Sequence, residues 1–341
     1  MNLADESGSV RAKVAPDHEV TISADAHGLV AQRGGQRFTS RLIRISSENG
    51  LISAMGRPYR GEISLRWLDG NIIIVNSLPL EDYLRAVVPC EMPTTFHPEA
   101  LKAQAVVSRA IALRWLGKHA AEGADFCDLT HCQVYQGASS ESARTDDAVA
   151  GTRGLVLTYA GEPASPVYHS TCGGHTADAG AVWPGRTFHP YLKGSPDILD
   201  GQPACAKSPH FRWQATVSRD ELDSALGVRD AKLQVAETDA SGRAAAVEVR
   251  FSDGRKRLTG VEFHLLLGRK LGWARVKSAR FTVRRVSEGW LFEGRGIGHG
   301  VGMCQWGANA RAHAGHAMPQ ILSHYFPATQ VSTRRTSVSR Q

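Results

Sequence analysis

The sequence predicts an α+β protein that is rich in β-structure, with several helices packed around a central groove. Between about residues 18 and 75, short β-branched runs alternate with Gly, Asn and Asp turn signals, a pattern typical of β-hairpins. Two later segments place apolar residues at helical spacing, and residues 211–293 return to a strand-like pattern. We expect a β-rich lead-in over 1–55, a main domain over 56–328 and a disordered tail over 329–341.

Residues 61–76 are predicted to form a β-hairpin. Apolar and polar side chains alternate from Gly61 to Trp67, which is the period of a half-buried strand. Asp69-Gly70 then supplies a tight turn into a second strand.

Two helices are predicted to follow the hairpin. Pro79 opens the first, which has acids in its first turn and which we expect Pro89 to end. The second begins at Pro98 and is apolar nearly all round. A helix of this kind is usually buried, so its polar residues Gln104 and Arg109 need partners or a cavity.

The rest of the chain mixes strands and helices. Residues 142–153 have a helical pattern, and the runs 155–159 and 166–170 are predicted to pair with each other around Gly161. A helical piece is expected near 260–271 within the strand-rich segment. A Gly-rich stretch then leads into a helical C-terminal region.

Composition and charge exclude several classes of protein. Hydrophobic residues make up 42% of the 341 residues and charged residues 21%, which is typical of a folded globular chain. The net charge of +7 suits an anionic partner, but the densest basic runs lie in predicted turns and strand ends, so we expect no nucleic-acid partner. No run of about 18 apolar residues is present, so we expect no transmembrane segment. The first residues lack the features of a secretory signal peptide.

Glu91 is the first candidate for chemistry. It lies in the apolar, proline-flanked stretch 87–93 between the two predicted helices. Removal from water disfavours the charged carboxylate, and a raised pKa is what a general acid needs to protonate a leaving oxygen near neutral pH. The alternative is an acid that caps the neighbouring helix or is exposed on a loop.

A second candidate is a metal site. Cys127 and Cys132 are close in sequence, with His131 beside the second and His119 a short way upstream. Thiolate and imidazole are the ligands that zinc prefers. Because four residues rather than the usual two separate the cysteines, a local disulfide or two buried thiols remain the alternatives.

Two Gly-containing segments carry further polar side chains. In residues 169–176, hydroxyls and imidazoles stand beside a Gly pair that lets a ligand approach the backbone; a Cys172 nucleophile with a histidine base is an alternative. Residues 294–308 lack the Lys-Ser/Thr ending of a phosphate-binding loop. This segment is interpreted either as a turn that presents His299 and Gln305 to a sugar or as a purely structural turn.

These segments, in this order, resemble the stage II sporulation protein D family, which includes the LytB amidase enhancers. The resemblance runs from about residue 61 to residue 327. The stretches that carry it are 78–84, 91–93, 100–105, 130–135, 170–176 and 294–296.

The resemblance implies a peptidoglycan lytic transglycosylase of the cell envelope, outside the cytoplasm, with 56–328 as its catalytic domain. Such an enzyme cleaves the bond between N-acetylmuramic acid and N-acetylglucosamine in glycan strands stripped of stem peptides. The family's catalytic glutamate falls on Glu91, which would act as acid and then as base to leave 1,6-anhydro ends. The alternative is a non-catalytic peptidoglycan-binding enhancer of a cell-wall amidase.

The resemblance also implies a cofactor and a set of substrate contacts. Family members can carry zinc near the site, and a structural zinc here would take Cys127 and Cys132 together with His119 or His131. The residues expected to bind the substrate are Gln104, Arg109, Tyr168, Ser170, Thr171, His175, His299 and Gln305.

The chain departs from the family pattern at two cysteines. Cys90 stands where a small residue is usual, and Cys304 stands where serine is usual. We expect these two cysteines to lie close in space, and Cys172 with Cys205 is a second possible pair.

Overall fold

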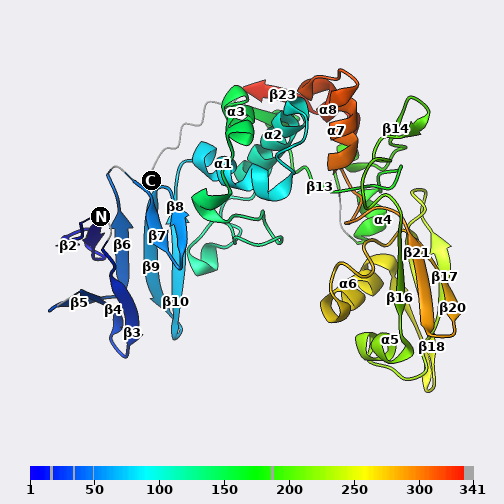
Figure 1. Cartoon of the computed structure of the whole chain (residues 1–341), viewed down its shortest axis with the longest axis horizontal. Helices are drawn as coiled ribbons and strands as arrows, with labels where there is room; N and C mark the ends of the chain where they lie inside the picture. The colour runs from blue at the N-terminus through cyan, green and yellow to red at the C-terminus, as the bar shows by residue number, and fades with distance from the viewer. Residues whose placement is uncertain (16–17, 34, 49, 186–187, 334–341) are drawn as a thin grey trace. The chain divides into compact units, whose positions relative to one another are not determined.

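The computed structural model describes residues 1–15, 18–33, 35–48, 50–185 and 188–333. The chain forms two compact units, one of residues 1–95 and 112–153, the other of residues 96–111 and those from 154 onward. Both units combine helices with mainly antiparallel strands, which confirms the predicted α+β, β-rich class (Figure 1). In the part of the chain that the structure describes, every helix is too short or too polar to span a bilayer.

A five-stranded antiparallel sheet in the order β10-β9-β6-β1-β2 dominates the N-terminal part of the first unit (Figure 1). Its strands are β1 (Asn2–Ala4), β2 (Val10–Lys13), β6 (Leu42–Ser46), β9 (Glu62–Leu68) and β10 (Asn71–Ser77). A second sheet and a hairpin consist of β3 (Thr21–Asp25), β4 (Gly28–Arg33) and β5 (Gln36–Ser40), and of β7 (Ile52–Ala54) and β8 (Arg57–Tyr59). Buried Leu3, Leu29, Ile43 and Ile63 belong to one core. Residues 1–55 therefore share a sheet and a core with the strands that follow them.

The hairpin of β9 and β10 confirms the prediction for residues 61–76. Asp69 and Gly70 form its two-residue turn, with φ angles of 47° and 80°. Both angles lie in the left-handed region, which aspartate tolerates and glycine adopts without a steric penalty.

Helix α1 (Leu80–Glu91) runs further than predicted. Pro89 lies inside the helix instead of ending it, which corrects the prediction. Proline cannot donate a backbone hydrogen bond to the preceding turn. The buried Val88 nevertheless anchors this turn, and its carbonyl accepts a hydrogen bond from the N–H of Met92 at 3.0 Å. Glu91 is therefore the last residue of the helix, whereas the sequence predicts it between the two helices.

The predicted second and third helices are confirmed as α2 (Pro98–Arg114) and α3 (Ala143–Gly151). Two short 3₁₀ segments, η1 (Ala120–Glu122) and η2 (Gly137–Ser140), precede α3. Ion pairs tie α1 to this region, because Arg85 contacts Asp146 and Glu141 at 2.8 Å each, and Glu141 also contacts Arg60 at 2.7 Å. The network holds the helix that ends at Glu91.

In the second unit, β11 (Leu155–Tyr159) pairs with β12 (Glu162–Pro163) and β23 (Gln330–Thr333). Strand β13 (Tyr168–His169) instead runs parallel to β22 (Met303–Cys304). The predicted pairing of 155–159 with 166–170 is therefore wrong. The tail expected to be disordered from residue 329 contains a strand through Thr333, and its last residues, 334–341, lie outside the described ones. The partners of β13 and of β23 are far away in sequence, where a local pattern cannot reveal them.

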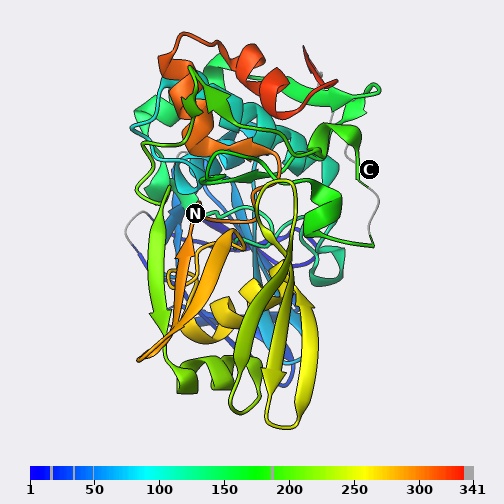
Figure 2. The ribbon, with the colours of Figure 1, turned by 90° about the vertical axis from the view of Figure 1, so that its right-hand side faces the viewer.

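Residues 213–294 contain two three-stranded sheets and two helices (Figure 2). The sheets consist of β16 (Trp213–Val217), β21 (Gly289–Gly294) and β20 (Phe281–Val286), and of β17 (Lys232–Thr238), β18 (Ala244–Phe251) and β19 (Gly254–Thr259). Helices α5 (Arg219–Leu226) and α6 (Gly260–Leu271) share a core with them through Leu222, Val247 and Phe263. Helix α6 confirms a prediction. Helix α5 has no predicted counterpart, although Ser218 and Glu221 form a capping box that the sequence displays.

The remaining elements of the second unit are short. They are α4 (Ala179–Val182), η3 (Pro190–Leu192), β14 (Ile198–Leu199), β15 (Gln202–Pro203), α7 (Gln305–His313) and α8 (Met318–Tyr325). Helices α7 and α8 confirm the helical C-terminal region.

Candidate functional site

Glu91 is a half-buried carboxylate at the end of α1. Its Oε1 accepts a hydrogen bond from the backbone N–H of Val134 at 2.6 Å, although the two residues are 43 positions apart. The helix fixes one end of the side chain and the N–H fixes the other. The carboxyl group is therefore held in a defined orientation, as an acid or base catalyst requires.

Tyr83 places a buried hydroxyl within electrostatic range of this carboxylate. Its ring stacks on those of Phe126 and Tyr135, at centroid distances of 5.7 and 5.3 Å. Burial is the main cause that raises the pKa of Tyr83 far above its ordinary value, and the neighbouring Cys132 and Glu91 add to the shift. The hydroxyl has no hydrogen-bond partner among the described residues. It is a neutral donor that the predicted site did not include, because Tyr83 is indistinguishable in sequence from the apolar residues around it.

Four side chains expected to hold metal lie together in the first unit. One potential ligand atom from each of His119, Cys127, His131 and Cys132 lies within 4.8 Å of all the others. His131 Nδ1 is 3.3 Å from His119 Nε2, 3.6 Å from Cys127 Sγ and 3.7 Å from Cys132 Sγ. For zinc bonds of about 2.05 Å to nitrogen and 2.3 Å to sulfur, the edges of a tetrahedron are about 3.3 Å for N–N and about 3.6 Å for N–S. The four groups therefore fit a tetrahedrally coordinated metal ion.

The loop of residues 127–132 carries three of these four side chains, and it is followed directly by the segment that contacts Glu91. Backbone hydrogen bonds close it, from Cys132 N–H to the Leu129 carbonyl at 3.0 Å and from Tyr135 N–H to the Asp128 carbonyl at 3.1 Å. Val134, the donor to Glu91, lies within this closed segment. Anything that fixes the loop therefore also fixes the carboxylate.

Four of the predicted substrate-binding residues are buried in the second unit: Gln104, Arg109, Thr171 and Gln305. The Gln305 side-chain amide donates to the Gln104 oxygen at 3.2 Å. Arg109 donates to the Leu155 carbonyl at 2.9 Å. The Thr171 and Ser208 hydroxyls are 2.7 Å apart. All four side chains are therefore engaged in hydrogen bonds inside the second unit.

His299 is half-buried, and both of its ring nitrogens make hydrogen bonds inside the second unit. Its Nδ1 accepts from the Val301 N–H at 3.1 Å, so Nε2 carries the proton and donates to the Tyr168 carbonyl at 2.8 Å. Removal from water lowers the pKa of His299 to about 4, and the ring is neutral at pH 7. Both ring nitrogens hold the Gly-rich turn in place.

Tyr168, Ser170 and His175 are half-buried, in contrast to the four buried side chains described above. The Ser170 hydroxyl is 3.4 Å from that of Thr171, and His175 Nδ1 donates to the Thr176 carbonyl at 2.6 Å. With His299, these three side chains are the predicted substrate contacts that combine partial exposure with hydrogen-bonding groups.

The expected cysteine pairs are not disulfides. All six cysteines fall within the described residues and carry unpaired thiols. The Cys304 sulfur belongs to a group with Cys172, Cys205 and Asp197, and Cys90 is not a member of that group. Cys172 Sγ and Cys205 Sγ are 3.5 Å apart, whereas a disulfide bond is about 2.05 Å long. Strand β22, which pairs with β13, brings Cys304 to Cys172.

Comparisons with known proteins agree with this arrangement of motifs. A family model described as Stage II sporulation protein matches residues 68–159, and one described as a domain of unknown function (DUF8618) matches residues 195–302.

Relatives match over most of the chain. Stage II sporulation protein D of Bacillus subtilis is 34% identical over 274 residues, which are 76% of this chain and 76% of the relative. The protein of the same name in Bacillus amyloliquefaciens is 33% identical over 78% of each chain. An amidase enhancer of Bacillus subtilis is 29% identical over 73% of this chain and 40% of its own length. This chain belongs to the stage II sporulation protein D family.

Proposed function

We propose that this protein is a peptidoglycan lytic transglycosylase that acts outside the cytoplasm and uses Glu91 as general acid and then as base. Its substrate is a glycan strand without stem peptides, cut between N-acetylmuramic acid and N-acetylglucosamine. The observation that carries the proposal is the hydrogen bond of 2.6 Å from the Val134 N–H to Glu91 Oε1 at a half-buried helix end. A general acid must be oriented and partly withdrawn from water, and Glu91 meets both requirements.

The hydrogen bond distinguishes the two carboxyl oxygens of Glu91. A backbone N–H can only donate, so Oε1 must accept and cannot itself carry a proton toward Val134. The carbonyl oxygen of a protonated carboxyl group is the better acceptor, so we propose that the proton of the acid form sits on Oε2. This assigns Oε2 as the atom that delivers the proton to the glycosidic oxygen.

The reaction needs one carboxyl group. Glu91 gives its proton to the glycosidic oxygen, and the bond between that oxygen and C1 of the muramoyl residue breaks, with its electron pair left on the departing alcohol. The muramoyl C6 hydroxyl forms a new bond to C1, and its proton returns to the Glu91 carboxylate. No water is consumed, so the second carboxylate that ordinary glycosidases use to activate water is not required.

Positive charge that develops at C1 needs nearby dipoles. The oxygen of the Tyr83 hydroxyl is proposed as one source, because the group is buried and neutral and interacts electrostatically with Glu91. Tyr168, Ser170 and His175 are proposed to contact the glycan strand, since they are half-buried and polar.

We further propose that His119, Cys127, His131 and Cys132 hold a structural zinc ion. Two imidazole and two thiolate ligands complete a tetrahedron and leave no position for a substrate, which is typical of structural sites. Bound zinc would supply a cross-link between the chain near residue 119 and the loop 127–132. This cross-link would fix the position of Val134. The hydrogen bond from Val134 would in turn fix the carboxyl group of Glu91.

A second candidate function is enhancement of a cell-wall amidase without catalysis. It is favoured by the relative named an amidase enhancer. In that case the protein would bind glycan strands and stimulate a partner, and Glu91 would have no chemical role.

Digestion of denuded glycan strands separates the two functions. We expect the purified protein to release fragments with 1,6-anhydro ends, detected by mass spectrometry, and we expect Glu91→Gln to release them at least about a hundredfold more slowly. Absence of such fragments, combined with amidase stimulation that Glu91→Gln leaves unchanged, would establish the enhancer instead. Hydrolytic fragments with reducing ends would contradict the anhydro mechanism.

A further inference from the structure

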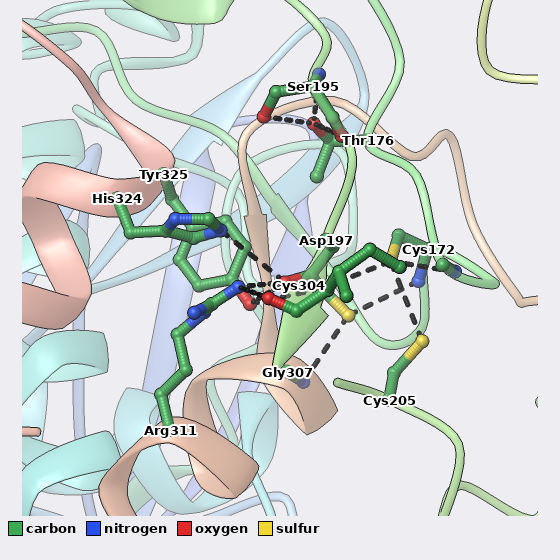
Figure 3. Close-up of polar contacts among 12 residues, drawn as sticks. Cys172, Thr176, Ser195, Asp197, Cys205, Cys304, Gly307, Arg311, His324 and Tyr325 are labelled. Atoms are coloured by element: carbon green, nitrogen blue, oxygen red, sulfur yellow. Dashed lines mark hydrogen bonds and ion pairs between the residues drawn. The ribbon is translucent and has the colours of Figure 1, made fainter. Parts of the chain in front are cut away.

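A second group of metal-ligand side chains lies in the second unit, where the sequence predicts no metal. Cys172, Cys205, Cys304 and Asp197 each place one ligand atom within 4.8 Å of the other three (Figure 3). All four are buried, and the exposed fraction of Cys172, Asp197, Cys205 and Cys304 is 0% in each case. Cys172 follows β13, Asp197 precedes β14, Cys205 follows β15, and Cys304 is the residue before α7. The fold therefore brings three sulfur ligands and one carboxylate from distant segments together at a buried position.

The spacing of the ligand atoms suits coordination. Cys172 Sγ is 3.5 Å from Cys205 Sγ and 3.2 Å from Asp197 Oδ2. In a tetrahedral zinc site with bonds of about 2.3 Å to sulfur and 2.1 Å to oxygen, the S–S edge is about 3.8 Å and the S–O edge about 3.6 Å. The observed values lie within a few tenths of an ångström of these edges, so small side-chain shifts would admit an ion.

Backbone N–H groups point at the sulfur atoms. Gly174 N–H donates to Cys172 Sγ at 3.2 Å, and Cys172 N–H donates to Cys304 Sγ at 3.2 Å. Gly307 N–H, in the first turn of α7, donates to Cys304 Sγ at 3.4 Å. A thiol is a weak acceptor and a thiolate a good one, and metal-bound thiolates characteristically receive such bonds. These bonds are an observation independent of the spacing, and they favour sulfur in its ligating form.

Asp197 is oriented by groups on its far side from the sulfurs (Figure 3). Arg311 Nη2 contacts Asp197 Oδ1 at 2.8 Å, and the Tyr325 hydroxyl donates to the carboxylate at 3.1 Å. His324 Nε2 lies 3.4 Å from the same oxygen. Oδ2 faces Cys172 Sγ at 3.2 Å and also lies 3.1 Å from the Tyr325 hydroxyl. An oxygen held by outer partners while the other faces the ion is the usual arrangement of a ligating carboxylate.

A bound cation would balance the charge of the cluster in its ligating form. With all three cysteines as thiolates, they and Asp197 would carry four negative charges within 4.8 Å of one another in a buried site. Such charges cannot remain together in a dry interior unless they are compensated. A divalent ion, the Arg311 guanidinium in its ion pair, and the buried Arg243, which donates to the Cys172 carbonyl at 3.0 Å, would balance the set.

We infer that Cys172, Cys205, Cys304 and Asp197 form a second metal site, which binds zinc as a closed, structural ion. Four protein ligands leave no open position, so the ion has no direct role in chemistry. It ties together the turn after β13, the hairpin of β14 and β15 and the start of α7. Cys172 lies between the half-buried Ser170 and His175 in sequence. An ion bound to its sulfur would therefore fix the backbone between these two residues. The inference does not depend on the proposed reaction.

Metal content of the full chain tests the site. We expect the reduced, purified protein to retain about two zinc ions per chain. A Cys127→Ser/Cys132→Ser variant removes the other site and should retain about one, and adding Cys205→Ser should reduce this to about zero. Cys90→Ser is the matched control, because Cys90 belongs to neither cluster, and it should retain about two. A Cys127→Ser/Cys132→Ser variant that folds but holds no zinc would overturn the inference.

A measurement on the unaltered chain covers the case in which a variant fails to fold. X-ray absorption at the zinc edge should give an average of about 2.5 sulfur ligands per zinc, because one site supplies two and the other three. An average of two or fewer would overturn the inference. So would a Cys172–Cys205 disulfide found by peptide mapping of the unreduced protein, since that bond removes two of the ligands.

Discussion

The carboxylate of Glu91 accepts a hydrogen bond of 2.6 Å from the backbone N–H of Val134. Val134 follows Cys132 by two residues, and Cys132 is one of four side chains whose spacing fits a tetrahedral metal ion. The loop that holds Glu91 through Val134 therefore also carries side chains of the candidate metal site of the first unit. A change at either is expected to be felt at the other.

Glu91→Gln is expected to lower the rate of anhydro-product formation by about 10²–10⁴-fold. The substitution removes the transferable proton but keeps an oxygen that can accept from the Val134 N–H, so the thermal midpoint should change little. Initial rates on denuded strands, together with melting followed by circular dichroism, measure both effects. Glu6→Gln, which changes an exposed acid of the same unit, should leave the rate unaltered. A wild-type rate for Glu91→Gln would refute the acid/base role.

Removal of metal from the first unit is expected to destabilise the protein and to reduce activity in parallel. Without the ion, the loop 127–132 loses its cross-link, and Val134 is no longer fixed against Glu91. Each kcal/mol lost lowers the melting temperature by about 2–4 °C for a chain of 150–250 residues. Cys132→Ala should lower both the melting temperature and the activity, and Cys90→Ala should lower neither. A chelated protein that melts unchanged while it loses all activity would point to a catalytic ion instead.

Glu99→Gln is expected to destabilise the protein near pH 7 but not at low pH. Burial alone would raise the pKa of Glu99, but hydrogen bonds from Lys102 and the Met318 N–H outweigh it and lower the pKa below its ordinary 4.5. The contacts are 2.7 Å each; that with Lys102 lies within α2, and that with Met318 joins α2 to the start of α8. A lowered folded-state pKa gives stability that is present above the unfolded value and is lost as the pH falls through the folded one.

Urea unfolding at pH 7 and at about pH 3 measures this difference. We expect a loss of about 1–2 kcal/mol for Glu99→Gln at the higher pH and a smaller loss at the lower one. Asp147→Asn alters an exposed acid on α3 and should show no such dependence. Equal losses at both values would mean that the charge of Glu99 contributes nothing.

Gly307→Ala is expected to destabilise the second unit. A Cβ atom at this position would lie 2.1 Å from the Tyr325 hydroxyl oxygen and 2.4 Å from Asp197 Oδ2, and both side chains are buried. Overpacking of this kind costs about 1–3 kcal/mol. Gly254→Ala is the control, since its Cβ would meet only the Phe251 ring at 3.5 Å, an ordinary contact. Equal unfolding free energies for the two variants would show that the region around Asp197 can rearrange.

Local signals in the sequence predicted the elements that depend on neighbouring residues. Asp69-Gly70 specifies the turn of the β9–β10 hairpin through its own backbone preferences, and Pro98 marks the start of α2. The potential zinc ligands between His119 and Cys132 were also accessible, because they lie within fourteen consecutive residues that one short loop can bring together.

Only the tertiary structure determined the contacts between distant segments. Cys304 joins Cys172 because β22 pairs with β13, and Asp197 joins them through the ion pair and hydrogen bond that Arg311 and Tyr325 supply. Strand β23 likewise finds β11 across most of the second unit. Periodicity and turn preference act over a few residues, whereas these contacts depend on the path of the whole chain. The sequence by itself therefore determined which chemical groups were present and much of their local structure, and the fold decided which of them meet.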